Sequence, residues 1–318
     1  MTVRGLTLPN AQWRELTARE EAAIIDLHPQ ALLILGYPQS SVLRDKISQE
    51  ARLWERLDHP KVILRPYAPE IITFSPKDWA YTCYKLLEKY QDGIYPIEII
   101  PGNEFNIEGG GEDWDGMLQW LIAFGEEFSK KSSALLHLPA LSPVGNYQDG
   151  YRYLAEHELE IWYSTIDFHA YNLDQLQDHK LLHDLWPNRD IALTEYNRMY
   201  PNVVQSTMPN YVESTFYFIL KWETPEPGAP NVDLMGSIYY DDFKSNHNSV
   251  TLPGGAMPEF KQGFKDLADR LGKFVVGEPQ MDEVSINVGG GKFYAIQITT
   301  KGQMVYVTGS IPIFLKGI

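Results

Sequence analysis

Residues 31–66 read ALLILGYPQSSVLRDKISQEARLWERLDHPKVILRP, and the order of their patterns indicates how the chain folds. The apolar run at 31–36 predicts a strand buried on both faces, residues 41–57 carry apolar side chains at helical spacing, and residues 62–66 are again a short apolar run. A strand, a helix and a second strand in this order are typical of a parallel sheet whose connections run through helices. This strand–helix–strand pattern therefore predicts an α/β protein.

The same alternation repeats along most of the chain. Eight apolar runs are predicted to be strands, at residues 3–8, 31–36, 62–66, 97–101, 134–138, 166–169, 191–194 and 234–239. Helices are predicted at residues 17–27, 41–57, 76–90, 115–131, 149–163, 174–185, 209–222 and 258–272. Eight strand–helix pairs predict a (β/α)8 TIM barrel. An open, doubly wound sheet is the alternative, but the first strand–helix turn has no glycine-rich phosphate loop.

The C-terminal part of the chain has a different pattern. Alternating segments at 283–288, 292–299 and 303–309 are separated by glycine-containing turns, which predicts a small antiparallel meander. Such a meander is too short to bury a core of its own. We therefore expect a barrel over residues 1–273 and a meander over residues 274–318 that packs on the barrel.

The composition excludes several classes of partner. Of the 318 residues, 44% are hydrophobic and 22% are charged, a composition typical of globular proteins. Its formal net charge of −15 would repel phosphate backbones, so no nucleic-acid partner is expected. The apolar runs are far shorter than the roughly 20 residues that span a bilayer, so no membrane segment is expected. The first residues lack the apolar stretch of a signal peptide, which favours the cytoplasm.

Neither a metal nor an organic cofactor is required by the sequence. Cys83 is the single cysteine, which excludes an intramolecular disulfide and a cysteine-based zinc site. His179 and His183 lie four residues apart on a predicted helix, but the glutamate of a His-Glu-x-x-His zinc site is missing. No Gly-x-Ser-x-Gly motif occurs, so hydrolysis by a serine nucleophile is not expected.

Two glutamates follow predicted strands where barrel enzymes carry their chemistry. Asn103 and Glu104 follow the fourth strand, and Glu195 follows the seventh. Because the carboxyl ends of all barrel strands surround one mouth, we expect the two carboxylates to meet there. Carboxyl groups roughly 5–5.5 Å apart allow one to attack the anomeric carbon and the other to protonate the leaving oxygen. The sequence therefore predicts a retaining O-glycoside hydrolase with a carbohydrate substrate.

These residues resemble the clan A glycoside hydrolases, barrel enzymes that include many cellulases, mannanases and β-glycosidases. The resemblance covers most of the chain and rests on Asn103 and Glu104, on Glu195, and on the His-x-Tyr element of His169 and Tyr171 after the sixth strand. It implies that Glu104 is the acid/base, that Glu195 is the nucleophile, and that Tyr171 bonds the nucleophile. A β-linked glycan is the implied substrate.

Elementary electrostatics gives the same residues physical roles. The charge of Glu195 is expected to raise the pKa of Glu104 and make it a usable acid. Glu195 is expected to stay ionised by accepting hydrogen bonds from Tyr171 and Arg65. Arg65 lies on the third predicted strand, whereas much of the clan carries an arginine after the second. Asn103 is expected to hold the sugar 2-hydroxyl, a contact that strengthens in the transition state.

Loop aromatics are candidates for stacking on sugar faces. The best placed by sequence are Trp114, Tyr196, Tyr200, Tyr239 and Tyr240. Two other functions remain as alternatives. One is a barrel that binds glycan without cleaving it. The other is a metal-dependent barrel hydrolase that uses His169 and Asp167, which a chelator would inactivate and zinc would restore.

Overall fold

The computed structural model describes residues 2–8, 15–68, 71–108, 113–197, 199–218 and 237–245, together with the strands of the C-terminal part. The chain divides into two compact units, Met1–Ser249 and Val250–Ile318. The boundary expected after residue 273, and the packing of the meander on the barrel, stay predictions.

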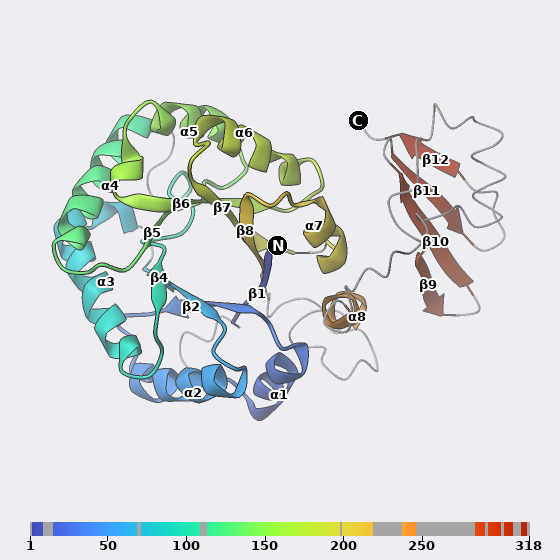
Figure 1. Cartoon of the computed structure of the whole chain (residues 1–318), viewed down its shortest axis with the longest axis horizontal. Helices are drawn as coiled ribbons and strands as arrows, with labels where there is room; N and C mark the ends of the chain where they lie inside the picture. Colours follow the sequence, from blue (N-terminus) through green and yellow to red (C-terminus); the bar gives the residue numbers. More distant parts are fainter. Residues whose placement is uncertain are drawn as a thin grey trace. The chain divides into compact units, whose positions relative to one another are not determined.

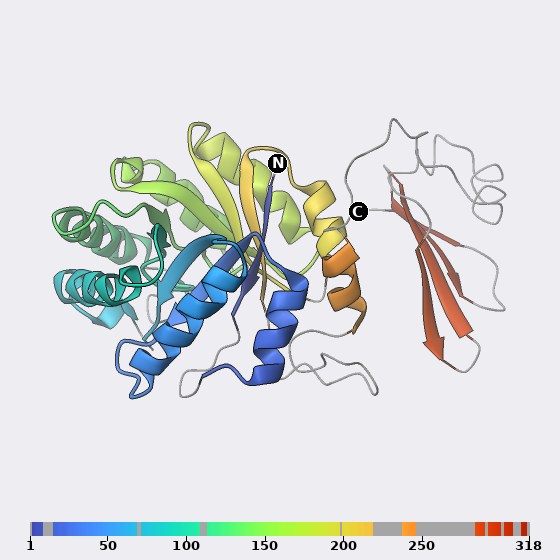
Figure 2. The same cartoon turned by 60° about the horizontal axis from the view of Figure 1, so that its bottom comes forward.

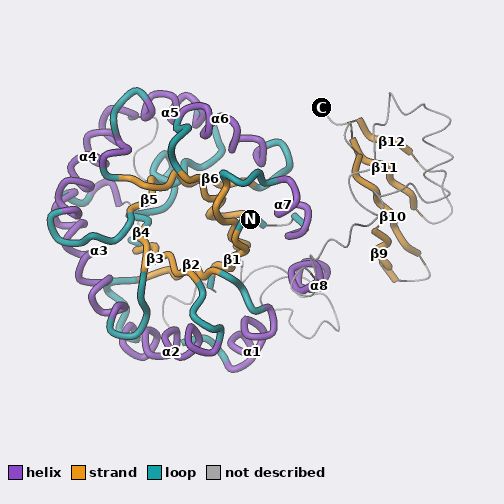
Figure 3. Tube along the Cα trace, viewed as in Figure 1, coloured by secondary structure: helices purple, strands orange, loops and turns teal. Residues whose placement is uncertain are grey.

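The first unit is a closed barrel of parallel strands, paired in the order β1 to β8 (Figures 1 and 3). The strands are β1 Val3–Thr7, β2 Ala31–Gly36, β3 Lys61–Pro66, β4 Ile97–Ile99, β5 Leu136–Leu138, β6 Tyr163–Ala170, β7 Asp190–Tyr196 and β8 Val212–Phe218. β8 pairs with β1 over the whole length of β1, which closes the barrel. The predicted TIM barrel is confirmed.

Helices form a layer outside the strands (Figure 2). They are α1 Ala18–Leu27, α2 Leu43–Arg56, α3 Pro76–Gln91, α4 Trp114–Ser129, α5 Tyr147–Ala155, α6 Asp178–Leu185, α7 Pro201–Thr207 and α8 Ser237–Ser245, with 3-10 turns at Ile71–Thr73, Leu159–Ile161 and Gln175–Gln177. Local signals explain some of the starts. Thr17 and Glu20 form a capping box before α1, and Ser75 caps α3.

The eighth strand is not where the sequence was expected to place it. Residues 212–218, VESTFYF, lie within the predicted helix 209–222 but form β8. Residues 237–239 of the predicted strand 234–239 belong to α8, and the rest of that prediction lies outside the described residues. β-branched and aromatic residues favour a strand, and Phe216 and Tyr217 are fully buried on opposite faces, as a barrel strand requires. The predicted helix 258–272 lies outside the described residues.

Two apolar layers hold the barrel together. The smaller one fills the interior with side chains from the strands and the segments that follow them: Ala31, Leu33, Leu35, Tyr37, Ile63, Ile100, Phe216 and Phe218. The larger one lies between the strands and the helices. Gly5 of β1 makes room for the Phe216 ring, because a Cβ at residue 5 would lie 2.3 Å from a ring carbon.

The second unit contains a four-stranded antiparallel sheet in the order β12-β11-β10-β9. Its strands are β9 Val284–Gly289, β10 Lys292–Thr299, β11 Gly302–Val307 and β12 Ile313–Lys316. The predicted meander contains the first three of these strands, and β12 is additional. Among the described residues of the whole chain, no helix is long and apolar enough to cross a membrane.

Candidate active site

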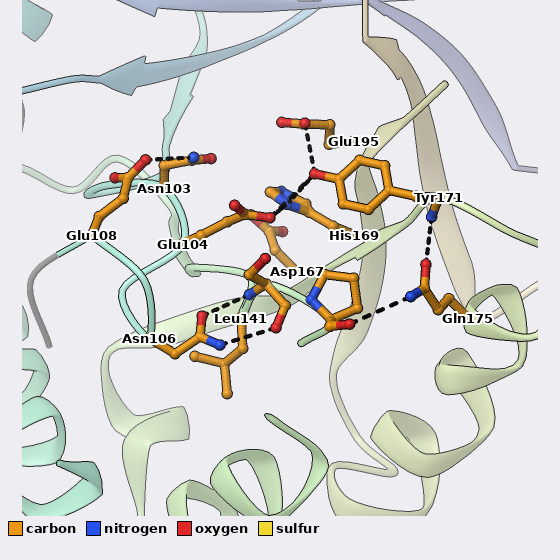
Figure 4. A network of polar contacts seen from close by, with 12 residues as sticks. Asn103, Glu104, Asn106, Glu108, Leu141, Asp167, His169, Tyr171, Gln175 and Glu195 are labelled. Carbon is orange, nitrogen blue, oxygen red and sulfur yellow. Dashed lines mark hydrogen bonds and ion pairs between the residues drawn. The ribbon is translucent and has the colours of Figure 1, made fainter. Parts of the chain in front are cut away.

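Polar side chains gather at the carboxyl ends of the barrel strands. Figure 4 shows Glu104 from the loop after β4, His169 and Tyr171 from the end of β6, and Glu195 from β7, all pointing toward one another. Arg65 of β3 reaches the same place through its contact with Glu195. All five were expected at this mouth: Glu104, Tyr171 and Glu195 from their positions after predicted strands, and Arg65 and His169 from their positions near the ends of predicted strands.

A single turn of helix positions Glu104. The backbone nitrogens of Ile107 and Glu108 both donate to the carbonyl oxygen of Glu104, at 2.9 Å each. The side chain of Asn106 holds this turn against the loop after β5, because it accepts from the backbone nitrogen of Ser142 at 2.7 Å and donates to the Ser142 carbonyl at 3.0 Å. The turn is therefore fixed to the next strand of the barrel.

An irregularity in β7 aims Glu195 into the barrel. The pairing of β6 with β7 steps from Phe168 opposite Leu193 to His169 opposite Glu195, so Thr194 is the extra residue of a bulge. In a regular strand Glu195 would share the face of Leu193, which packs against the helices. The bulge shifts the alternation by one residue, and bulges commonly re-aim side chains in this way.

The hydroxyl of Tyr171 bridges the two glutamates. It lies 2.7 Å from Oε1 of Glu195 and 3.1 Å from Oε1 of Glu104. These two oxygens are therefore no farther apart than the sum of 2.7 and 3.1 Å, which is 5.8 Å. The hydroxyl has one proton, so it donates to one carboxylate at a time. Its burial between two negative charges raises the pKa of Tyr171 far above the ordinary value.

Glu195 has the partners that the sequence led us to expect. Tyr171 donates to one carboxylate oxygen, and a guanidinium nitrogen of Arg65 lies 3.4 Å from the other. Both Arg65 and Glu195 are buried, with side-chain exposures of 3% and 10%. Each carboxylate oxygen of Glu195 therefore faces a partner, a cationic one at Oε2 and a hydroxyl donor at Oε1.

Glu104 differs from the expectation. Burial raises the pKa of Glu104, but the hydrogen bond and charge of His169 outweigh it, with help from the hydroxyls of Ser142 and Tyr171, and the pKa is lowered. His169 Nδ1 lies 2.8 Å from the Glu104 oxygen that also faces Tyr171. The prediction that the pKa of Glu104 is raised is wrong, because the hydrogen bond and charge of His169 lower this pKa more than burial raises it.

A third carboxylate, Glu108, lies beside the pair and was missed from the sequence. Asn103 donates from Nδ2 to Oε1 of Glu108 at 2.8 Å (Figure 4). Burial raises the pKa of Glu108, and its electrostatic neighbours include Arg65 and Glu104. The spacing of four residues between Glu104 and Glu108 is the signal that could have found it, since one helical turn places such side chains on one side.

A row of buried charges runs down the barrel below the site. His137 of β5 lies between Asp167 and Glu98, with 2.8 Å to each. Lys61 then lies 2.9 Å from Glu98 and 2.7 Å from Glu213, at the strand starts. Burial lowers the pKa of His137, but the two carboxylates raise it to about 10. Each charge in the row is therefore offset by an opposite one.

The ligand set expected for a metal-dependent hydrolase is not assembled at the mouth. Asp167 bonds His137, and His169 bonds Glu104. Within the described part of the chain, one cluster of histidine and carboxylates has ligand atoms within 4.8 Å of one another: Glu98, His137 and Glu213. It lies toward the strand starts, where the ammonium of Lys61 already pairs with both carboxylates.

Three of the predicted sugar-contacting aromatics lie in the outer layer instead. The bulge in β7 turns Tyr196 toward the helices, where it is fully buried 5.3 Å from the Tyr217 ring. Tyr239 belongs to α8 and packs near Tyr217, because the eighth strand was misplaced. Trp114 begins α4 and packs against α5 at Gly150. Two further candidates lie there too: Tyr200 pairs with Tyr239, and Tyr240 bonds Asp26 of α1.

Two aromatics that directly follow β2 and β3 were missed. Tyr37 and Tyr67 pack edge to face with ring centroids 5.5 Å apart, next to the interior cluster. Burial raises the pKa of Tyr67, and Glu108 and Arg65 are its charged neighbours. Their positions after predicted strands would have identified them had the same rule been applied to every strand.

Comparisons with known proteins establish the fold and leave the activity open. The sequence matches no protein-family model, and no curated protein matches it. A GH5 cellulase from an Icelandic hot spring isolate is similar in structure, with a TM-score of 0.58 and 9% identity over 82% of this chain and 91% of its own.

Two other solved structures widen the range of functions. A β-mannanase of Thermomonospora fusca in complex with mannohexaose has a TM-score of 0.52 and 8% identity, over 76% of this chain and 85% of its own. A putative deoxyribose-phosphate aldolase from Toxoplasma gondii has a TM-score of 0.51 and 12% identity, over 80% and 94%. At such identities these likenesses define a TIM barrel, a fold that hosts many unrelated activities.

Proposed function

We propose that the protein is a retaining glycoside hydrolase that cleaves the O-glycosidic bonds of a β-linked glycan or oligosaccharide. The observation that carries the proposal is the bridging hydroxyl of Tyr171, which limits the oxygens of Glu104 and Glu195 to a separation of at most 5.8 Å, the sum of 2.7 and 3.1 Å. Retaining enzymes hold their carboxyl groups roughly 5–5.5 Å apart, and inverting enzymes roughly 6.5–9.5 Å apart. The short spacing favours direct attack by a carboxylate over attack by an interposed water.

The two glutamates divide the reaction between them. An oxygen of Glu195 attacks the anomeric carbon while Glu104 gives its proton to the departing oxygen, which leaves a glycosyl ester on Glu195. Glu104, now ionised, takes a proton from a water whose oxygen attacks the same carbon and releases Glu195. Arg65 and Tyr171 hold Glu195 in position before the attack.

Glu104 must carry a proton at the first step, although its pKa is lowered in the unliganded site. His169 offers the source, because its Nδ1 lies 2.8 Å from the Glu104 oxygen. Transfer of that proton from an imidazolium leaves a neutral His169 and a neutral Glu104. A sugar that displaces water from the mouth favours this direction, since burial disfavours the ionised pair.

The similar cellulase and mannanase structures support the substrate class, and the similar aldolase is the main competing interpretation. An aldolase that forms a Schiff base needs an amine at its site. Among the described lysines, Lys46 bonds the carbonyl of Leu35 and Lys61 pairs with carboxylates at the strand starts. The other lysines of the first unit whose side chains are described are exposed. The described part of the mouth therefore favours carboxylate chemistry.

A trapping experiment tests the proposal directly. The protein is incubated with 2,4-dinitrophenyl 2-deoxy-2-fluoro-β-glucoside and the corresponding mannoside, in which fluorine slows both steps and the good leaving group restores the first. We expect one covalently bound sugar on the peptide that contains Glu195, detected by mass spectrometry. No adduct, together with no hydrolysis of a panel of aryl glycosides and polysaccharides, contradicts the proposal.

Azide separates the two roles. With Glu195→Ala, azide should restore cleavage of an aryl β-glycoside and give the α-glycosyl azide, because azide attacks in place of the carboxylate. With Glu104→Ala, azide should give the β-glycosyl azide, because it replaces the water at the second step. Glycan binding without turnover in the unmodified protein would instead indicate a non-catalytic carbohydrate-binding barrel.

A further inference from the structure

The turn after β4 brings the side chains of Asn103 and Glu108 into contact. Because the nitrogen of Glu108 bonds the carbonyl of Glu104, Glu108 begins one helical turn above it. From there its Oε1 accepts the Nδ2 hydrogen bond of Asn103 at 2.8 Å (Figure 4). Asn103, which precedes the candidate acid Glu104, is thus held by Glu108, four residues after that acid.

This contact fixes which end of the Asn103 amide faces the site. An ionised carboxylate can only accept hydrogen bonds, so the NH2 end of Asn103 must face Glu108. The carbonyl oxygen of Asn103 is thereby turned the other way, and although it is buried it has no hydrogen-bond partner among the described residues. Such an acceptor suits a hydroxyl donor from a ligand, which would supply the missing bond.

Glu108 lowers the stability of the folded protein. Its Oε2 atom is buried with no hydrogen-bond partner in the described part of the chain, and burial raises the pKa of its carboxyl group. A buried, half-satisfied carboxylate destabilises the folded state. Groups that carry such a cost beside other titratable side chains are commonly kept for function.

We propose that Glu108 is a positioning residue that orients Asn103 so that its carbonyl oxygen accepts a hydrogen bond from the sugar hydroxyl next to the reacting carbon, the 2-hydroxyl. This inference rests on the proposed glycosidase function. Glu108 acts through Asn103 and does not contact the reacting atoms. Because the 2-hydroxyl contact strengthens in the transition state, loss of the orientation lowers the rate of cleavage.

The test compares two substrates that differ only at that hydroxyl. Glu108→Ala is assayed on the aryl β-glycoside that the unmodified protein cleaves best and on its 2-deoxy counterpart. We expect kcat/KM to fall about 10- to 100-fold on the parent glycoside and less than about 3-fold on the 2-deoxy compound. Glu108→Gln keeps a carbonyl acceptor of the same shape and should recover most of the loss. Glu126→Ala, an exposed change on α4, is the control.

Two further measurements complete the test: the thermal stability of Glu108→Ala and the effect of combining it with Asn103→Ala. The thermal midpoint of Glu108→Ala should be equal to or above that of the unmodified protein, whereas a structural role would lower it. The double variant with Asn103→Ala should be no slower than Asn103→Ala alone, since both changes remove one function.

The possible failures are distinguishable. An equal loss on both substrates, no loss on either, or an equal loss in Glu108→Ala and Glu108→Gln overturns the role of Glu108 while the glycosidase function stands. If neither glycoside is cleaved by the unmodified protein and the fluoro sugar forms no adduct on Glu195, the glycosidase function itself fails.

Discussion

The imidazole of His169 donates from Nδ1 to Oε1 of Glu104 across 2.8 Å, and this contact lowers the pKa of a carboxyl group that burial alone would raise. Both side chains are nearly inaccessible, with exposures of 1% and 10%. The bond therefore stabilises a charged pair at a depth where an isolated carboxylate would prefer to be neutral. It makes His169 the residue that sets the proton affinity of the candidate acid.

Replacing His169 should move the pH dependence of the reaction. The free enzyme must hold the proton that Glu104 later delivers, and His169 and Glu104 share that proton, so the basic limb of the kcat/KM profile follows its loss from the pair. His169→Ala leaves Glu104 as the single carrier, without the partner that lowers its pKa and with the burial that raises it, so the basic limb should move to the position that Glu104 alone sets. The measurement is kcat/KM from pH 4 to 9, with His157→Ala as control. A limb that stays in place contradicts the assignment.

The buried position of His137 should make stability depend on pH. Its pKa is raised to about 10 in the folded protein, against roughly 6.5 in an unfolded chain. A raised folded pKa means that its contribution is complete below about pH 6.5 and is lost as the pH rises toward 10. Urea unfolding should therefore give a lower midpoint at pH 9 than at pH 6.5.

His137→Gln is the matched variant for that measurement. It removes the positive charge between Asp167 and Glu98 and should destabilise the fold by on the order of 3–5 kcal/mol at pH 6.5. It should also flatten the fall in midpoint between pH 6.5 and 9. A variant that keeps the slope of the unmodified protein would show that another group causes it.

Most of the barrel could be predicted because most of its strands have a recognisable local sequence pattern. Buried parallel strands such as Ala31–Gly36 are continuous branched apolar runs, and capping residues such as Thr17 and Ser75 mark helix starts. The eighth strand was missed because its seven residues, VESTFYF, group the polar and the aromatic side chains instead of alternating them, and they follow Pro209, which can begin a helix. Closure with β1, which decides between them, is a long-range property.

The candidate site, too, was predictable in part: strand positions predict some of its features, and others depend on contacts in the folded protein. Glu104, Glu195 and Tyr171 follow strand ends, so the barrel rule alone brings them together. The bulge at Thr194, which faces Glu195 inward and Tyr196 outward, has no signature in the local pattern. The lowered pKa of Glu104 was likewise out of reach, since it depends on which partner lies nearest in space.

Packing inside the barrel leads to a prediction about Gly5. An alanine there would place a methyl group 2.3 Å from a carbon of the Phe216 ring, which is fully buried in the interior. We expect Gly5→Ala to destabilise the protein by about 1–3 kcal/mol in urea unfolding. Combining it with Phe216→Leu should recover part of the loss, because the smaller side chain vacates the space. A double variant as unstable as the sum of the two single variants would contradict this account.

Removing only the hydroxyl of Tyr171 tests whether the bridge matters for the reaction. Tyr171→Phe keeps the ring but removes the donor that lies 2.7 Å from Glu195, so Glu195 is less firmly oriented for attack. We expect kcat to fall about 10- to 100-fold with a smaller change in KM. Tyr147→Phe is a matched control, because it also loses a 2.7 Å bond to a carboxylate, that of Asp178, between α5 and α6. Similar losses of kcat in both variants would mean that the effect is general, and unchanged turnover in Tyr171→Phe would remove the hydroxyl from the mechanism.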